Sequence, residues 1–339
     1  MKHIKTAFIF LILLVFLFLT EIIASQEQQI EKSFKGITAV QLNTIGGDCI
    51  VKAEPGDDIK IRFVHTYSNV TFEPQFKKEG SILMLKESFS ISNESGHSTW
   101  YLTVPENTAI KYSSISGNFS VTGIRNNVHG ISVSGDVVAK ECAGDLEFKS
   151  VSGDLDVMSL AGNITVRGVS SDLKLQELTG KIEVKSESGD VQGTKLDGRV
   201  VIKSPSGDIR LTDCSGTFDV KTASGEIQVA NTRFIKPSSF KTASGNINIT
   251  LAQSLTENLE LNSASGNAVL NYNGNAISGY FEFQVAADKG KIEAPFPFEK
   301  EEECERWGKK YQIKSFKVEL GTPQIFIRTS SGTATLKKN

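Results

Sequence analysis

Glycine recurs at intervals of nine residues through the middle of the sequence. Only Ser171 interrupts the series, which consists of Gly135, Gly144, Gly153, Gly162, Gly180, Gly189, Gly198, Gly207, Gly216 and Gly225. Apolar residues follow each step at the second and fourth positions, with polar residues between them, as at Leu155 and Val157. This alternation predicts a short, half-buried strand in every nonapeptide. One nonapeptide cannot bury its apolar face alone, so the copies must stack into a solenoid with a continuous core.

The chemistry beside the glycines repeats every second step. Serine precedes glycine in one series, at Ser134, Ser152, Ser188 and Ser206, whereas the alternate series carries Ala143, Ala161, Thr179 and Asp197. The chemical period is therefore 18 residues. We predict an all-β fold, a single-stranded parallel β-helix or β-solenoid with about 18 residues per coil, two nonapeptide strands in each coil, and a cap at the C-terminus.

The Ser-Gly-Asp steps are predicted to be structural turns. Glycine tolerates left-handed backbone, and an Asp side chain accepts backbone N–H bonds in an Asx turn. The predicted turn column comprises Gly135, Asp136, Gly153, Asp154, Gly189, Asp190, Gly207, Asp208 and Gly225. A third apolar position lies two residues before each step and is expected to point inward at the corners, at Val151, Leu160, Val169, Leu178, Leu196 and Cys214.

The aspartates of this column raise the alternative of a calcium-binding β-roll. Stacked carboxylates about 5 Å apart repel one another unless they are hydrogen-bonded or bridged by cations. Calcium-binding rolls also use nonapeptides, but their repeat carries paired glycines that help to complete an oxygen shell. Each unit here has one glycine, followed directly by the acid. We therefore predict no metal site and keep the β-roll as an alternative.

The regular block divides the chain into four segments. Residues 1–25 combine a basic start with an apolar run over residues 7–19, which predicts a signal peptide, with an uncleaved membrane anchor as the alternative. We expect an N-terminal β region and first coils at 26–111, the regular nonapeptide solenoid at 112–275, and a C-terminal coil and cap at 276–339. The cap is predicted to contain a helical turn near residues 299–309. The four cysteines are predicted to form no intramolecular disulfide, because Cys142 and Cys214 lie four coils apart.

Charge gives no indication of a nucleic-acid partner, and we predict from it that polyanion binding is disfavoured. The chain has 37 basic and 39 acidic residues, mixed along its length, for a net charge of -2. A nucleic-acid-binding protein usually carries a basic patch or stripe. The outward strand positions are interpreted first as solvated faces, and second as a broad, low-affinity contact surface for glycan or protein.

No catalytic constellation is recognisable, so we predict a protein that is not an enzyme, with no cofactor. None of the four histidines has a metal-ligand partner at the right spacing, and no nucleophile or phosphate-binding motif occurs. The most enzyme-like stretch is residues 73–98 with His97. Trp100 and Trp307 have rings that stack on sugars, although packing in the core or cap is the favoured interpretation. A carbohydrate-active β-helix enzyme with an unrecognised site stays as the alternative.

The stretch YLTVPENTAIKYSSISGNFSV at residues 101–121, together with the repeated Ser-Gly-Asp or Ser-Gly-Asn units, resembles the bacterial putative-adhesin group of β-strand-repeat proteins. The resemblance extends over residues 37–339 and names a family of unknown function. It implies a single-stranded β-helix, usually right-handed, with links to envelope-stress systems in some relatives, and no catalytic residues.

We therefore expect an exported, non-enzymatic adhesin or envelope scaffold that binds an envelope polymer, glycan or protein partner through residues that the sequence does not identify. The expected location is the periplasm, the cell surface or the extracellular space, with membrane contact only if the signal is uncleaved.

Overall fold

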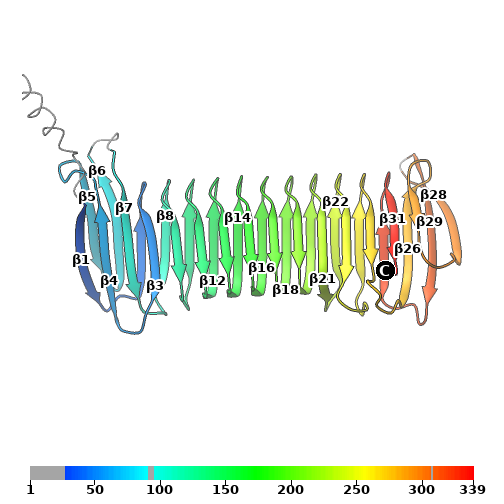
Figure 1. Ribbon diagram of the computed structural model, residues 1–339, viewed down its shortest axis with the longest axis horizontal. Coiled ribbons are helices and arrows are strands. Elements are labelled where there is room, and N and C mark those ends of the chain that lie inside the picture. Colours follow the sequence, from blue (N-terminus) through cyan, green and yellow to red (C-terminus); the bar gives the residue numbers. More distant parts are fainter. Residues whose placement is uncertain (1–26, 91–94, 307) are drawn as a thin grey trace, which may run out of the picture.

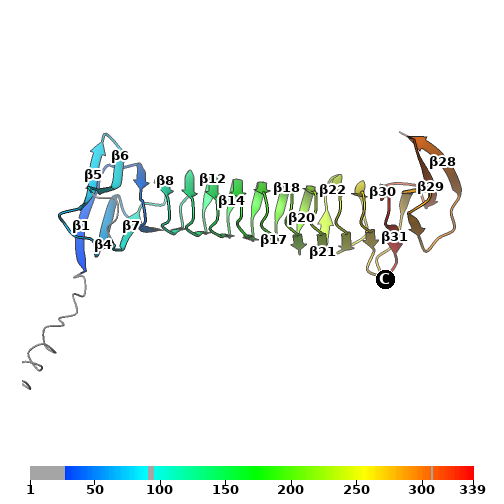
Figure 2. The ribbon, with the colours of Figure 1, turned by 90° about the horizontal axis from the view of Figure 1, so that it is seen from above.

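The computed structural model describes residues 27–90, 95–306 and 308–339. The predicted signal peptide at residues 1–25 lies outside this part of the chain, as does Trp307. The described residues form 31 β-strands and no helix, and the strands follow one another along a narrow rod (Figures 1 and 2). The prediction of an all-β solenoid class is confirmed at this level.

The body of the rod has two faces, which the chain visits in alternation. Face A carries mostly short strands: β9 (Phe119–Thr122), β11 (Val137–Lys140), β13 (Leu155–Met158), β15 (Leu173–Gln176), β17 (Val191–Thr194), β19 (Ile209–Thr212), β21 (Ile227–Phe234), β23 (Ile247–Leu251) and β25 (Ala268–Asn271). Face B carries β8 (Ala109–Ser114), β10 (Val128–Ser132), β12 (Ala143–Ser150), β14 (Ala161–Gly168), β16 (Thr179–Ser186), β18 (Asp197–Ser204), β20 (Ser215–Thr222), β22 (Ser238–Thr242) and β24 (Leu259–Ser263).

Neighbouring strands on one face are parallel and paired residue for residue. Val166 on β14 pairs with Val184 on β16, and Leu155 on β13 pairs with Leu173 on β15, so each partner lies 18 positions further along the chain. From β8 to β25 this interval lengthens only towards the C-terminal end, where Phe240 lies 20 residues after its partner on β20. Equivalent positions therefore form straight columns along the rod.

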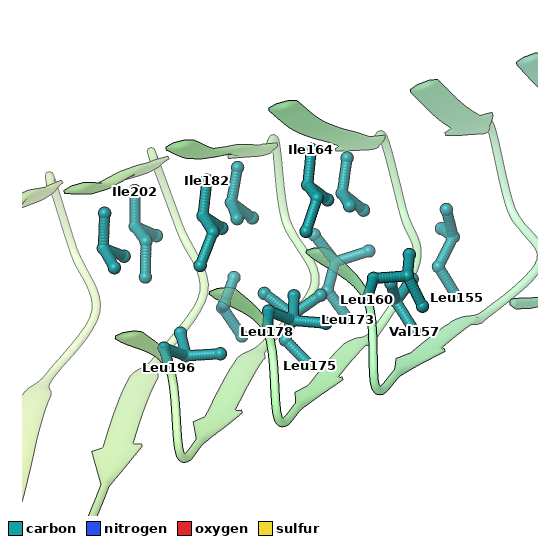
Figure 3. Packing of buried hydrophobic residues seen from close by; sticks show 14 of the residues in the cluster. Leu155, Val157, Leu160, Ile164, Leu173, Leu175, Leu178, Ile182, Leu196 and Ile202 are labelled. Atoms are coloured by element: carbon teal, nitrogen blue, oxygen red, sulfur yellow. The ribbon is translucent and has the colours of Figure 1, made fainter. Parts of the chain in front are cut away.

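Apolar columns from both faces fill the narrow space between them. Leu155 and Val157 on face A and Ile164 on face B are at most 1% exposed, and equivalent residues of the next coils stack beside them (Figure 3). Leu160, Leu178, Leu196 and Cys214 are buried as predicted. The same prediction is wrong for Val151 and Val169, which are 45% and 43% exposed, because the two corners of a coil differ in geometry.

The Ser-Gly-Asp corner uses glycine for close stacking, and our prediction of left-handed turns there is wrong. A Cβ atom on Gly207 would lie 2.0 Å from the carbonyl oxygen of Gly189, and none of the Ser-Gly-Asp glycines has a positive φ. Left-handed backbone occurs at the opposite corner instead, at Glu141, Ser159, Glu177, Lys195, Asp213 and Asn231, with φ between 51° and 57°. The alternate glycines, such as Gly180 at φ 125°, begin the face-B strands.

A buried hydroxyl supports each Ser-Gly-Asp corner. The Oγ atom of Ser132 accepts a hydrogen bond from the backbone N–H of Gly135 at 2.8 Å. The same bond recurs three residues apart at Ser114–Gly117, Ser150–Gly153, Ser186–Gly189, Ser204–Gly207, Thr222–Gly225, Thr242–Gly245, Ser263–Gly266 and Thr329–Gly332. One coil has the two residue types exchanged, with Gly168 at the hydroxyl position and Ser171 at the glycine position. The buried Ser171 hydroxyl has no hydrogen-bond partner among the described residues.

Restoring the usual order in this coil is expected to stabilise the protein. Gly168→Ser alone places its Cβ 2.9 Å from the Ser171 Cβ, and such overpacking costs about 1–3 kcal/mol. The double variant Gly168→Ser/Ser171→Gly removes this contact, removes the unpaired hydroxyl and adds a hydrogen bond worth about 1 kcal/mol. A double-mutant cycle of denaturant midpoints should show strong coupling. Additive effects would contradict this account.

At the N-terminal end the first coil, β2 (Ala39–Asn43) and β3 (Asp48–Ala53), lies between the body and an inserted cap. It pairs with β8 and β9 on one side, and with β6 (Ile82–Phe89) and β7 (Ser98–Val104) on the other. Antiparallel strands complete this end: β1 (Gln28–Lys35), β4 (Asp58–His65) and β5 (Phe72–Glu79).

The C-terminal end repeats this plan. The last coil, β30 (Gln324–Arg328) and β31 (Thr333–Lys337), inserts between β24/β25 and the strands β26 (Gly279–Ala286) and β27 (Lys291–Glu293). The outer strands β28 (Lys300–Arg306) and β29 (Lys309–Val318) are antiparallel, so the predicted helical turn near residues 299–309 is wrong. Phe281 and Phe283 on β26 stack against Phe316 on β29, and aromatic residues of this kind are enriched in strands.

Candidate functional site

The aspartates of the Ser-Gly-Asp corner form a ladder that joins successive coils. The Oδ1 atom of Asp172 accepts a hydrogen bond from the backbone N–H of Asp190 at 2.9 Å, and Asp154 accepts one from Asp172 at 3.1 Å. The acceptors of this Asx ladder are Asp48, Asn118, Asp136, Asp154, Asp172, Asp190, Asp208, Asn246 and Asn267. These side chains accept backbone N–H bonds as predicted, but each bond joins two successive coils and does not close an Asx turn within one coil. A backbone amide of one coil is thereby fixed to the next.

Charge is not required for this bond, because asparagine occupies three of the positions. Replacing Asp172 by Asn is expected to leave stability unchanged or slightly higher at low salt. The side-chain oxygen that accepts the hydrogen bond is kept, and the repulsion between neighbouring carboxylates, at most about 1 kcal/mol, is reduced. Asp172→Ala removes the acceptor and should lower stability by about 1 kcal/mol. Thermal unfolding of both variants at low and high salt measures the difference. Equal losses for Asn and Ala would show that the charge matters.

Calcium is expected to leave the thermal midpoint nearly unchanged. The described residues contain no cluster of three or more His, Cys, Asp or Glu side chains placed to hold a metal ion. Each ladder carboxylate already uses one oxygen on a backbone amide, and Arg210 binds Asp190 and Asp208 at 3.4 and 3.0 Å. A rise of more than about 10 °C in millimolar calcium would contradict this view, because about 1 kcal/mol shifts the midpoint by only 2–4 °C in a chain of this size.

A basic column runs along face B on the other side of the same corner. Lys149 pairs in register with Arg167, Arg167 with Lys185, and Lys185 with Lys203. The pairing continues through Lys221 to Lys241, which gives six consecutive strands with a cation at the same outward position. We call these six residues the basic column.

Acidic neighbours only partly neutralise the basic column. Four of its lysines form ion pairs of 2.6–3.1 Å: Lys149–Glu147, Lys185–Glu183, Lys221–Asp219 and Lys241–Glu260. Arg167 and Lys203 form no ion pair within the described part of the chain, because Thr165 and Val201 occupy the neighbouring position. Lys181 and Arg199, paired with each other on β16 and β18, add two further cations to the centre of the face.

The opposite face is acidic along the same corner. The Asx ladder contributes Asp136, Asp154, Asp172, Asp190 and Asp208, and Asp156 adds another carboxylate on face A. All of them except Asp208 line a shallow groove of about 290 Å³, together with Lys174. The outward positions still carry charges of both signs on both faces, as interpreted from the sequence, with Glu183 and Asp219 on face B and Lys174 and Arg210 on face A. Within this mixture, charges of one sign are gathered into columns, because the fold stacks every eighteenth residue.

Comparison with protein families decides the classification. A sequence profile of the Toastrack family, DUF4097, matches residues 37–294, which is most of the chain. The chain belongs to the Toastrack DUF4097 family. No curated protein matches it. A crystal structure of a putative cell adhesion protein from Clostridium sporogenes has 10% sequence identity to it, with coverage of 92% of this chain and 99% of that one. The TM-score between the two structures is 0.21.

The enzyme-like stretch of this Toastrack chain, residues 73–98, contains a buried carboxylate that our sequence reasoning missed. Glu87 is 1% exposed and accepts hydrogen bonds from Ser98 Oγ, Trp100 Nε1 and the backbone N–H groups of Ile45 and Gly47. It thereby completes the first corner of the solenoid. The alternation of Leu83, Leu85 and Glu87 in one strand is the signal that predicts an inward Glu87.

The other residues singled out as chemically interesting in the sequence form no catalytic cluster among the described residues. His97 Nε2 lies 3.0 Å from Thr99 Oγ1, and Glu73 lies exposed on β5. Burial raises the pKa of the Cys142 and Cys214 thiols, which keeps them protonated and poorly nucleophilic. Trp100 is fully buried, as the favoured interpretation predicted, and so is unavailable to sugars. None of the described residues forms a helix with the length and apolarity to cross a bilayer.

Proposed function

We propose that this Toastrack protein is an exported, non-enzymatic scaffold of the adhesin type, which presents the long faces of its solenoid to a glycan or protein partner in the cell envelope. The proposal includes export by residues 1–25, a repeating coil of 18 residues with two strands, closure of the rod by its two end regions, and no cofactor. The partner binds along the faces and not in a pocket.

The observation that carries this proposal is the unbroken residue-for-residue stacking of the body. From β10 to β20 every face-B residue meets its equivalent in the next coil, and no inserted loop interrupts the face. Such a surface offers flat columns of like side chains over many coils, as extended repeat proteins use for binding. Enzymes need convergent acids, bases or nucleophiles around a cavity. In the described residues Glu87 and His97 instead make structural hydrogen bonds.

Fractionation of cells that produce the native chain tests the proposal. The protein is expected outside the cytoplasm and should sediment with purified envelopes of its own organism, where cross-linking and pull-down would identify the partner. Envelopes treated with the folded chain should release no soluble fragments. The heat-unfolded chain serves as the control for sedimentation. A cytoplasmic location, sedimentation no better than that control, or release of sugar fragments would each overturn the proposal.

A further inference from the structure

The basic column is straight, long and one residue wide. It spans six strands of face B, from β12 to β22, and parallel strands lie about 4.8 Å apart. The cations therefore recur once per coil over roughly 24 Å. The rigid sheet holds their Cα atoms in line before any ligand arrives, so binding has only to order the side chains.

The ion pairs within the face do not prevent such binding. The paired lysines keep between 36% and 46% of their side chains exposed. Exposed pairs of this kind contribute little to stability. They can be exchanged for the anionic groups of a ligand, and Arg167 and Lys203 need no exchange at all. The two additional cations, Lys181 and Arg199, lie on the same central strands, β16 and β18.

We propose that the basic column binds a linear polyanion that lies along the solenoid axis, with one anionic group near each cation. This inference rests on the proposed function and names the chemical class of the envelope partner. The shared chemistry is a chain bearing phosphates or carboxylates, whether a phosphodiester polymer or an acidic polysaccharide. A polymer fits better than a flat anionic membrane, because the acids Glu147, Glu183 and Asp219 stand in the adjacent column and would face a broad anionic surface.

Nucleic acid fits this surface less well. Proteins that bind single strands combine cations with aromatic side chains on which the bases stack. The strands of the basic column carry Phe148, Phe218 and Phe240, and all three rings are buried in the core. The surface can therefore attract the charged backbone of a nucleic acid, but it has no exposed aromatic ring among these three on which a base could stack.

Two matched triple variants of the full chain test the inference. The column variant is Arg167→Gln/Lys185→Gln/Lys203→Gln on face B. The control variant is Lys140→Gln/Lys174→Gln/Arg210→Gln, which removes the same charge from face A. Thermal unfolding establishes that both fold. Binding of linear polyphosphate and of polygalacturonate is measured at 50 and 300 mM salt, with neutral dextran and duplex DNA as comparisons.

The native chain is expected to bind at least one of the two polyanions, more weakly at high salt, and to ignore dextran. The column variant should lose at least about tenfold in affinity at low salt, and the slope of log K against log salt should fall by about 2, as expected for three lost contacts with a single strand. The control variant should stay within about twofold of the native chain. The response to polyphosphate and polygalacturonate tells which anionic group is preferred.

Several results would overturn the inference. The first three are no binding of either polyanion, equal losses of affinity in the two variants, and a preference for DNA. The fourth is self-association at low salt that requires the basic column, which would identify the acidic corner of a second copy as the occupant. Envelope sedimentation separates this inference from the proposed function. A column variant that sediments like the native chain refutes the polyanion site alone, whereas a native chain that fails to sediment refutes the scaffold proposal.

Discussion

Replacing Gly207 by alanine is expected to destabilise the solenoid by about 3 kcal/mol or more. The added Cβ would lie 2.0 Å from the carbonyl oxygen of Gly189 and 2.7 Å from its carbon atom. Overpacking of flexible side chains costs about 1–3 kcal/mol, but here the obstacle is backbone that two parallel ladders hold in place. The coil must therefore shift, which weakens the Ser204 hydroxyl bond and the Asx ladder on both sides.

Ser206→Ala is the matched control, because Ser206 is the exposed neighbour in the same corner. It should change the thermal midpoint little, whereas Gly207→Ala should lower it strongly or give insoluble protein. Hydrogen exchange would then locate the loss, with faster exchange confined first to β17, β18 and β19. A Gly207→Ala variant as stable as Ser206→Ala would show that the coils stack less closely than the structure indicates.

Much of the fold was predictable because local and global signals coincide in a repeat. The alternation around Leu155 and Val157 predicts strands, and the Ser-Gly-Asp interval predicts which residues become neighbours. The reason for the glycines was not predictable in this way. A left-handed turn and a close backbone contact both select glycine, and only the position of Gly189 beneath Gly207 distinguishes them. The same limit applies to Val151 and Leu160, which look alike in sequence but lie at corners of different geometry.

The end regions were less predictable, since no period connects their residues. Gly47 and Gly117 are 70 residues apart in the sequence and stack directly, and Gly266 and Gly332 do the same across 66 residues. Nothing local in the intervening segments indicates that the chain leaves the stack and later returns to it. Glu87 belongs to such a segment, and its four donors come from positions as far away as Ile45.

The candidate surface was hidden for a related reason. Averaged over the sequence, the charges nearly cancel, with 37 basic and 39 acidic residues. Lys185 and Asp190 are only five residues apart, yet they lie on opposite sides of one corner. Reading every eighteenth residue, instead of every neighbouring one, separates the two columns. The sequence therefore contained the basic column, but only the stacking register shows which charges act together.

Deleting residues 188–205 is expected to yield a folded protein that is shorter by one coil. The deletion joins Glu187 to Ser206 and makes β16 the neighbour of β20, with β15 next to β19. Ser186 and Ser204 are equivalent, as are Asp190 and Asp208, so the hydroxyl bonds, the Asx ladder and the apolar columns all continue across the junction. The free energy of unfolding should fall by about the contribution of one repeat and one interface between repeats, as in nearest-neighbour solenoids.

Deleting only residues 188–196 should destroy the fold. This shorter deletion joins Glu187 to Asp197, so the eight residues of β18 enter face A, where β15 and β19 have four each. Gly198, whose φ is 123°, would stand at the Ser-Gly-Asp corner, and the left-handed position of Lys195 would be lost. The larger deletion is thus expected to destabilise the protein less than the smaller one, which is the reverse of what ordinary globular packing would give.

Soluble yield, circular dichroism and thermal unfolding of the two deletion variants, with a 27-residue deletion as a third, measure this order of stability. Success of the 27-residue deletion together with failure of the 18-residue one would require a three-sided coil. It would refute the two-faced architecture on which the scaffold proposal and the basic column depend.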